Sequence, residues 1–411
     1  MLCSMRPTDS AFIAFFLLSV SLILISCGSN QGEPSTSDRK LSEVLEPSVQ
    51  IELKYDSIVE TADFSYYLPS VLIGDERFTT VIFFDPQGEG GQPLSKYMEL
   101  ADNLGLALIG SSVSKNGLTM DLISDHYQNL IQTIRSNFKG SSGKIILAGF
   151  SGGAKVATQF GLSDPSVIGV VATGAMLDPQ GKRPNMPLAL IAGKGDLNHQ
   201  SMLLSSLQLM QEKRQVMFQQ FGGTHEWCPL GLMRSSVQWI MQKQSLINEE
   251  ERTKSFNKAE SKLEGLSGLD EFIALQALAT AYGDLPEMES HKIRLQEMAS
   301  SGILTKELNA LYERTDREEA TKQQYVEQLQ SVDLIWWEKE ISRLKNEATG
   351  ESERAFQAQR LLGFIGLYCY MTADKMLQQT GSDPSGIIEV YLLAEPDNPK
   401  AERMKAEVLG L

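Results

Sequence analysis

The middle of the chain alternates short, unbroken apolar runs with longer amphipathic stretches, and this alternation restricts the possible folds more than any other feature. Strands that are buried on both faces appear in a sequence as continuous apolar runs, as in a parallel sheet covered by helices on both sides. The alternation therefore predicts βαβ units and an α/β fold with a doubly wound, mostly parallel sheet. The predicted strands are residues 48–55, 63–68, 81–84, 106–109, 145–148, 168–171, 188–191 and 216–221, and the predicted helices are residues 94–104, 119–138, 153–162, 200–213 and 231–244.

A Gly-Phe-Ser-Gly-Gly motif at residues 149–153 directly follows the apolar run 145–148 and precedes a predicted helix. In this context the motif is typical of a nucleophile elbow, a strand-to-helix turn so tight that its neighbouring residues must lack a Cβ atom. The turn would raise the hydroxyl of Ser151 above the sheet edge, at the positive end of the following helix. We therefore predict Ser151 as a nucleophile and the backbone N–H of Gly152 as an oxyanion donor.

A nucleophilic serine needs a general base, and the base needs a carboxylate that orients it. His225 lies in a Gly-rich loop just after the predicted strand 216–221, which brings it to the same sheet edge as Ser151. Asp196 follows the preceding predicted strand. The chain order Ser151, Asp196, His225 predicts a catalytic triad.

Other residues compete for two of these roles. Asp178 follows the predicted strand that ends near Thr173, where some hydrolases place the acid, so it is the alternative to Asp196. His199, three residues after Asp196, is the alternative base, although it also fits a helix start or a substrate contact. His126 lies within an amphipathic stretch and is predicted to be a surface residue.

With this motif and this residue order, residues 63–244 resemble the α/β-hydrolase superfamily. The region is most similar to compact secreted esterases of the dienelactone hydrolase and polyhydroxybutyrate depolymerase-like type. Dienelactone hydrolases carry a cysteine nucleophile, so Ser151 departs from them and favours ester chemistry. The resemblance implies a carboxylic ester hydrolase that works through an acyl-enzyme on Ser151.

The second oxyanion donor is expected from the loop after the predicted strand 81–84. Many esterases carry a His-Gly motif there, whereas this chain has Gln87-Gly88. Because a backbone donor does not require the His side chain, we predict the N–H of Gln87 for this role, with Gly88 as the alternative.

The N-terminus carries an apolar run, residues 11–25, which is short for a membrane span of about 20 residues. The run fits a secretory signal, and its end, Leu-Ile-Ser-Cys at residues 24–27, resembles the lipobox of bacterial lipoproteins. The resemblance implies a signal peptide at residues 1–26 and acyl chains on Cys27. An uncleaved anchor and an ordinary signal peptide are the alternatives.

Residues 27–47 are rich in Ser, Gly, Pro and Asn and are predicted to form a lipidated, flexible tether. Gly28 is not the Asp that often retains lipoproteins in the inner membrane. The expected location is therefore the bacterial cell envelope, at the outer membrane, on its periplasmic or its outer surface.

From about residue 252 helical periodicity replaces the strand pattern. We therefore predict an all-α domain at residues 252–411 after an α/β-hydrolase domain at residues 48–247. Residues 315–318, Thr-Asp-Arg-Glu, have the form of a capping box and predict a helix start. The turn at residues 391–399 resembles that between tetratricopeptide units, although no repeat of about 34 residues recurs. The predicted helices are residues 252–263, 270–282, 289–300, 305–314, 318–346, 352–379, 385–393 and 400–409.

The composition and the motifs restrict the classes of partner and cofactor that this chain is expected to bind. A net charge of −15 repels phosphate backbones, and no basic patch occurs, so no nucleic-acid partner is predicted. No zinc-like Cys/His spacing or phosphate-binding motif predicts a metal or cofactor. The expected partners are a small ester or acylated carbohydrate and a membrane through the lipid on Cys27. The helical domain is expected either to bind a protein or peptide partner or to be a scaffold that covers the hydrolase domain. A peptidase and a non-catalytic envelope protein remain the alternative functions.

Overall fold

The computed structural model describes residues 52–75, 78–138, 141–247, 249–379 and 381–410. The predicted signal peptide, Cys27 and the tether at residues 27–47 lie outside the described residues. Residues Ser48–Leu411 form one compact unit. Within the described residues, no helix combines the length and the apolar character needed to cross a membrane.

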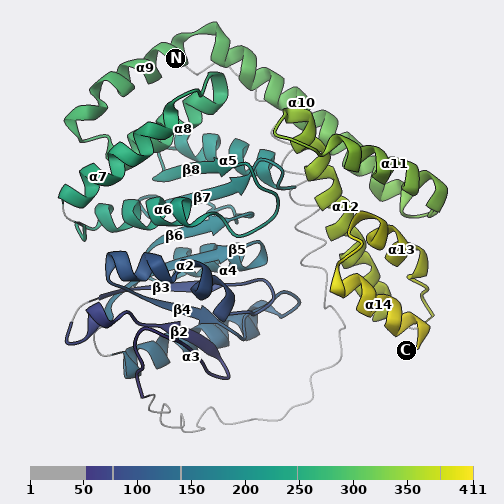
Figure 1. Ribbon diagram of the computed structural model, residues 1–411, viewed down its shortest axis with the longest axis horizontal. Coiled ribbons are helices and arrows are strands. Elements are labelled where there is room, and N and C mark those ends of the chain that lie inside the picture. Colours follow the sequence, from purple (N-terminus) through teal and green to yellow (C-terminus); the bar gives the residue numbers. More distant parts are fainter. Residues whose placement is uncertain (1–51, 76–77, 139–140, 248, 380, 411) are drawn as a thin grey trace. The chain divides into compact units, whose positions relative to one another are not determined.

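Within the described part of the chain, eight strands form one sheet in the order β1-β2-β4-β3-β5-β6-β7-β8 (Figure 1). β1 and β2 pair antiparallel with each other and β2 pairs antiparallel with β4, whereas every other pair is parallel. The predicted fold class, a mostly parallel sheet of the α/β-hydrolase type followed by helices, is thereby confirmed. The strands are β1 Ile58–Glu60, β2 Phe64–Tyr67, β3 Phe78–Phe84, β4 Leu106–Ser111, β5 Ser141–Phe150, β6 Val167–Thr173, β7 Leu188–Gly193 and β8 Val216–Phe221.

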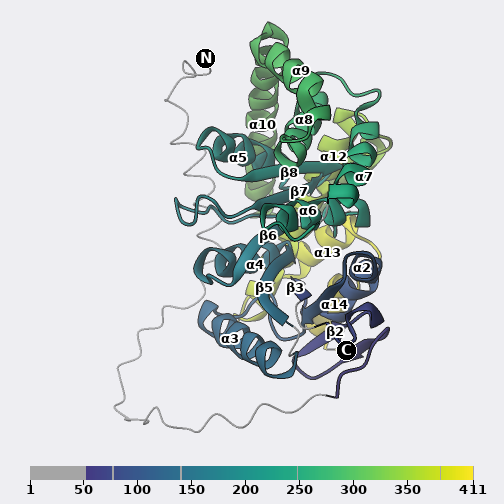
Figure 2. The same cartoon turned by 90° about the vertical axis from the view of Figure 1, so that its left-hand side faces the viewer.

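Two layers of helices cover the two faces of the sheet, as Figure 2 shows. Side chains of β3 alternate between the layers, so that Ile82 and Phe84 join one apolar core while Val81 and Phe83 join the other. This alternation explains why residues 81–84 of β3 are apolar at every position. Helices α3, α4 and α5 contribute to the first core, and helices α2 and α6 contribute to the second. The helices are α2 Gly91–Leu104, α3 Met120–Asn137, α4 Gly152–Ser163, α5 His199–Gln211 and α6 Leu230–Lys243.

The remaining helices divide between the sheet and a core of their own. Helix α8 lies next to β8 and reaches both faces of the sheet, because Ile273 belongs to the first core and Leu278 to the second. Helices α10 to α14 share a separate core that contains Trp337 and Ile365. The division into domains 48–247 and 252–411 stays a prediction. These helices are α7 Glu249–Glu260, α8 Gly268–Tyr282, α9 Glu289–Ser300, α10 Gly302–Gln328, α11 Leu334–Glu347, α12 Glu353–Leu377, α13 Ser385–Ala394 and α14 Pro399–Leu409.

The predicted strand at residues 48–55 is wrong for its described part, because residues 52–55 join no strand. A side chain holds this backbone instead of a strand ladder. The Tyr66 hydroxyl donates a hydrogen bond to the carbonyl of Glu52 and accepts one from the N–H of Lys54. Among the described residues, the first strand is β1, at Ile58–Glu60.

The predicted helix start at residues 315–318 is also wrong, because α10 runs unbroken through it. The Thr315 hydroxyl donates a hydrogen bond to the carbonyl of Leu311, one turn earlier. Threonine side chains inside helices commonly make this bond. The break falls instead before Asp333, whose carboxylate caps α11. Glu318, which the capping pattern would expose, is completely buried.

Candidate active site

The turn between β5 and α4 has the geometry of a nucleophile elbow. Ser151 has φ 53° and ψ −121°, a conformation that residues with a side chain rarely adopt. A Cβ on Gly149 would lie 2.2 Å from the carbonyl oxygen of Gly153, and one on Gly153 would lie 1.9 Å from that of Phe84. Both glycines are therefore required for α4 to pack this closely against β3 and β5.

Three loops at one edge of the sheet bring Ser151, His225 and Asp196 together. The Nε2 atom of His225 lies 2.9 Å from Ser151 Oγ, and its Nδ1 atom lies 2.9 Å from Asp196 Oδ2. With a proton on Nδ1, the ring offers the Nε2 lone pair to the serine hydroxyl. The side chain of Asp196 is 1% exposed and that of His225 is 22% exposed. The carboxylate is therefore enclosed by protein, whereas the imidazole stays accessible from solvent.

Two residues that the sequence did not single out complete the surroundings of the acid. The N–H of Asn198 donates to Asp196 Oδ1 at 2.8 Å, and its side chain donates to the carbonyl of Gly174. Gly174 has φ +67°, and a Cβ there would lie 3.0 Å from Asp196 Oδ2 and 3.2 Å from His225 Cε1. The loop after β6 therefore closes against Asp196 and His225, and the one available sequence signal for it was a glycine following a buried strand.

The alternative residues lie elsewhere. Asp178 is exposed, and its Oδ1 accepts a hydrogen bond from the N–H of Gln180 within a local turn. His199 is buried, and its Nε2 lies 2.9 Å from the side-chain oxygen of Gln220. The contacts of Ser151 and His225 thus involve Asp196, not Asp178 or His199.

The predicted oxyanion donors differ in their surroundings. Gly152 opens α4, where the first N–H groups of a helix have no partner within it. The N–H of Gln87, in contrast, donates to Asp85 Oδ1 at 2.8 Å, and that of Gly88 donates to the Asp85 carbonyl. The assignment of Gln87 as an oxyanion donor stays a prediction, and in this structure its N–H is bonded to the buried carboxylate of Asp85.

Asn116 lies against Gly152, and no sequence pattern indicates this contact. Its Oδ1 atom would be 1.9 Å from a Cβ on Gly152, and its N–H donates to the carbonyl of Pro86. The loop after β4 thus lies against both segments from which oxyanion donors were expected. No residue except glycine fits at position 152 without displacing this side chain.

Burial of His199 makes an acid-sensitive contribution to stability. Desolvation lowers the pKa of His199 from 6.5 to about 4, and its Nδ1 atom has no hydrogen-bond partner among the described residues. The unfolded chain therefore binds the proton first as the pH falls. Folding stability contributed by neutral His199 is present above pH 6.5 and is lost progressively as the pH falls toward 4.

We expect the free energy of unfolding to fall by about 2 to 3 kcal/mol more in the native protein than in His199→Gln when the pH is lowered from 7 to about 4.5. Glutamine keeps a neutral hydrogen-bonding group next to Gln220 but does not titrate. Urea unfolding of both proteins at the two pH values measures the difference. Equal losses would show that another group controls the acid sensitivity.

No protein family model and no curated protein sequence matches this chain. An esterase from Pyrobaculum calidifontis is 12% identical over 47% of this chain and 86% of its own, with a TM-score of 0.36. An S-formylglutathione hydrolase from Staphylococcus aureus is 15% identical over 44% of this chain and 88% of its own, with a TM-score of 0.34. Est1E from Butyrivibrio proteoclasticus is 10% identical over 46% of this chain and 98% of its own, with a TM-score of 0.36.

Proposed function

We propose that this chain is a serine hydrolase that cleaves carboxylic esters through an acyl-enzyme on Ser151. The observation that supports this most is the continuous contact from Ser151 Oγ through His225 to the buried carboxylate of Asp196. Each of the three side chains comes from a different loop. Such an arrangement polarises a serine hydroxyl, and the Gly152 N–H beside it suits a developing oxyanion.

The reaction would begin when His225 Nε2 takes the proton of Ser151 and Oγ attacks the ester carbonyl carbon. The negative charge that develops on the carbonyl oxygen is stabilised by the Gly152 N–H and the N-terminal end of α4. His225 then gives the proton to the departing alkoxide, which leaves as an alcohol. Water attacks the acyl-enzyme by the same steps in reverse, and the carboxylic acid is released. Asp196 holds the imidazole and stabilises its protonated form throughout.

We also propose that acyl chains on Cys27 anchor the protein to the bacterial outer membrane. This proposal rests on the lipobox-like residues 24–27 and on the tether that follows them. An enzyme held in the envelope meets acylated carbohydrates and small esters, and these are the substrates we propose. The helical region is proposed as a surface for a protein partner.

Covalent labelling tests the hydrolase proposal directly. Protein that lacks residues 1–27 is incubated with a fluorophosphonate, and the modified peptide is identified by mass spectrometry. We expect one label, on Ser151, and hydrolysis of a short aryl acetate that declines in proportion to the labelled fraction. Label on another residue, or ester hydrolysis that persists after complete labelling, would contradict the proposal.

A further inference from the structure

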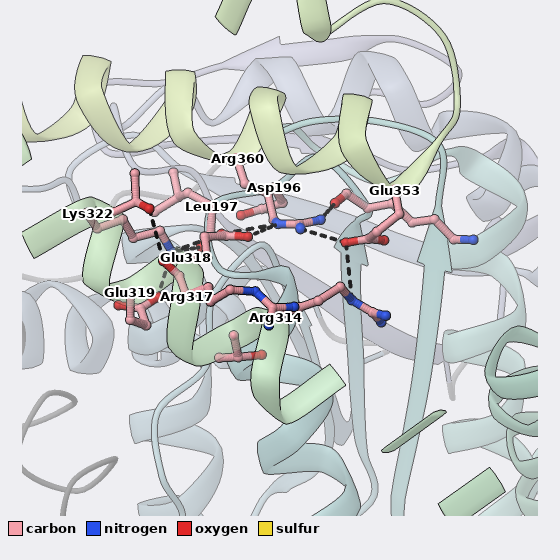
Figure 3. A network of polar contacts seen from close by, with 12 residues as sticks. Asp196, Leu197, Arg314, Arg317, Glu318, Glu319, Lys322, Glu353 and Arg360 are labelled. Atoms are coloured by element: carbon pink, nitrogen blue, oxygen red, sulfur yellow. Dashed lines mark hydrogen bonds and ion pairs between the residues drawn. The ribbon is translucent and has the colours of Figure 1, made fainter. Parts of the chain in front are cut away.

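Side chains of the helical region bind the loop that carries Asp196. This acid loop, residues 194–198, joins β7 to α5. Arg360 of α12 donates from Nη1 to the carbonyl of Lys194 at 2.8 Å. Lys322 of α10 donates from Nζ to the carbonyl of Leu197 at 3.4 Å. Two cations of the helical region therefore bind the backbone on both sides of Asp196. Figure 3 shows Arg360 and Lys322 beside Asp196 and Leu197.

These cations belong to one ion cluster, which consists of Glu318, Glu319, Lys322, Glu353 and Arg360. The Nε atom of Arg360 lies 2.9 Å from Glu318 Oε2, and its Nη2 atom lies 2.8 Å from Glu353 Oε1. The side chains of Arg360 and Glu318 are 1% and 0% exposed. Lys322 contacts Glu318 at 3.3 Å and Glu319 at 2.8 Å. Arg360, Glu318 and Lys322 are thus buried, whereas Glu319 and Glu353 are partly exposed, and the cluster holds three carboxylates around two cations.

Close packing adds to these polar contacts. A Cβ on Gly195 would lie 2.1 Å from Gln359 Oε1, so only glycine lets α12 approach the acid loop this closely. The Gln359 side chain is itself fixed, because its Nε2 atom donates to the carbonyl of Ala348. The ring of Phe356, one turn earlier on α12, faces the Lys194 ammonium at 5.9 Å. The backbone from Lys194 to Leu197 therefore has little freedom to move.

Stability alone does not explain a buried cluster of this kind. Removing two charges from water costs several kcal/mol, and apolar side chains of similar volume are often as stable or more so. Arginine has a property that apolar residues lack, because its rigid fork binds several acceptors in fixed directions. Here one guanidinium binds two carboxylates and a carbonyl of the acid loop at once.

We propose that Arg360, held by Glu318 and Glu353, is a positioning residue for Asp196, so that the helical region takes part in building the triad; this inference rests on the proposed hydrolase function. Arg360 does not touch the reacting atoms. It fixes the acid loop so that Asp196 Oδ2 meets His225 Nδ1 at hydrogen-bonding distance. A misplacement of about 1 Å in such a contact lowers the rate by a factor of about 100.

The main variant is Glu318→Gln combined with Arg360→Met in the otherwise complete protein. Changing both residues avoids an unpaired buried charge, and glutamine still accepts a hydrogen bond from Lys322. We expect kcat for an aryl acetate to fall about 100-fold while KM changes less than about threefold. The thermal unfolding midpoint should stay close to that of the native protein.

The matched control is Glu347→Gln combined with Arg343→Met on α11, where Arg343 binds Glu340 and Glu347. This pair lies in the same helical region, and we expect its removal to leave kcat unchanged. A milder variant, Lys322→Met, leaves Glu318 paired with Arg360 and should lower kcat about tenfold. Lys322→Met therefore tests the proposal if the double variant fails to fold.

A second measurement does not depend on turnover. The proton shared between His225 Nδ1 and Asp196 gives a far-downfield NMR signal, which His225→Gln identifies by its loss. We expect the signal in the native and control proteins and its loss or displacement in the double variant. A native protein without esterase activity would contradict the proposed function, while this signal would still test the positioning role. An unchanged signal and kcat in the double variant, or equal losses in the control, would overturn the inference.

Discussion

Replacing Ser151 with alanine is expected to lower kcat for aryl ester hydrolysis by a factor of about 10⁴ or more. Alanine has no nucleophilic oxygen, so no acyl-enzyme forms and His225 has no hydroxyl proton to accept. The residual rate would come from substrate binding and the oxyanion donors acting on water. Initial rates with a short aryl acetate, compared with the native protein at one pH, measure the loss.

Ser163→Ala is the matched control, because Ser163 lies at the other end of α4 and is exposed. This variant should keep its rate within about a factor of two, as surface substitutions usually change little. If the free energy of unfolding of Ser151→Ala is close to that of the native protein, the loss of activity does not come from unfolding. Equal rates for Ser151→Ala and the native protein would remove Ser151 from the chemistry.

Replacing Asp196 with asparagine is expected to lower kcat about 10⁴-fold, an effect known for triad acids in general. An asparagine amide that donates to His225 Nδ1 favours the imidazole tautomer with the proton on Nε2. That tautomer has no lone pair for the Ser151 hydroxyl. The asparagine oxygen still accepts the hydrogen bond from the N–H of Asn198, so the acid loop should keep its conformation. Rates of ester hydrolysis across pH 6 to 9 test this.

Asp178→Asn separates the two candidate acids. Because Asp178 is exposed and bonded only within its own turn in the described contacts, its amide variant should keep nearly the native kcat. The sequence left this choice open, since both residues follow a buried strand. A large loss in Asp178→Asn together with a native rate in Asp196→Asn would reverse the assignment.

Local patterns were sufficient to predict the sheet and the proximity of Ser151, Asp196 and His225. Strands β3, β4 and β7 are buried at every position, and such strands are recognisable as apolar runs without any knowledge of their neighbours. Ser151, Asp196 and His225 each follow a strand of a parallel sheet, and the carboxyl ends of such strands meet at one edge. The chain order therefore placed the three residues together before any distance was known.

Contacts between distant segments were not predictable in this way. Arg360 lies within a stretch that was correctly predicted as a helix, yet nothing near it indicates a bond to the Lys194 carbonyl 166 residues away. The pattern at residues 315–318 predicts a cap, because a local pattern cannot reveal that Glu318 has its partner, Arg360, on another helix. The Gln87 N–H was assigned to an oxyanion, although Asp85, two residues earlier, already accepts its hydrogen bond.

Helix α8 has a consequence for how small this protein can be made. In an open sheet, the last strand exposes unpaired backbone groups that can recruit a strand from another molecule. Helix α8 lies along β8 and packs into the cores of both faces, and Gln220 of β8 donates to Asp270 of α8. A chain shortened after α6 would therefore keep every triad residue but present an uncovered edge. We expect such a fragment to self-associate through that edge. A shortened chain would therefore have to retain α8 to keep β8 covered.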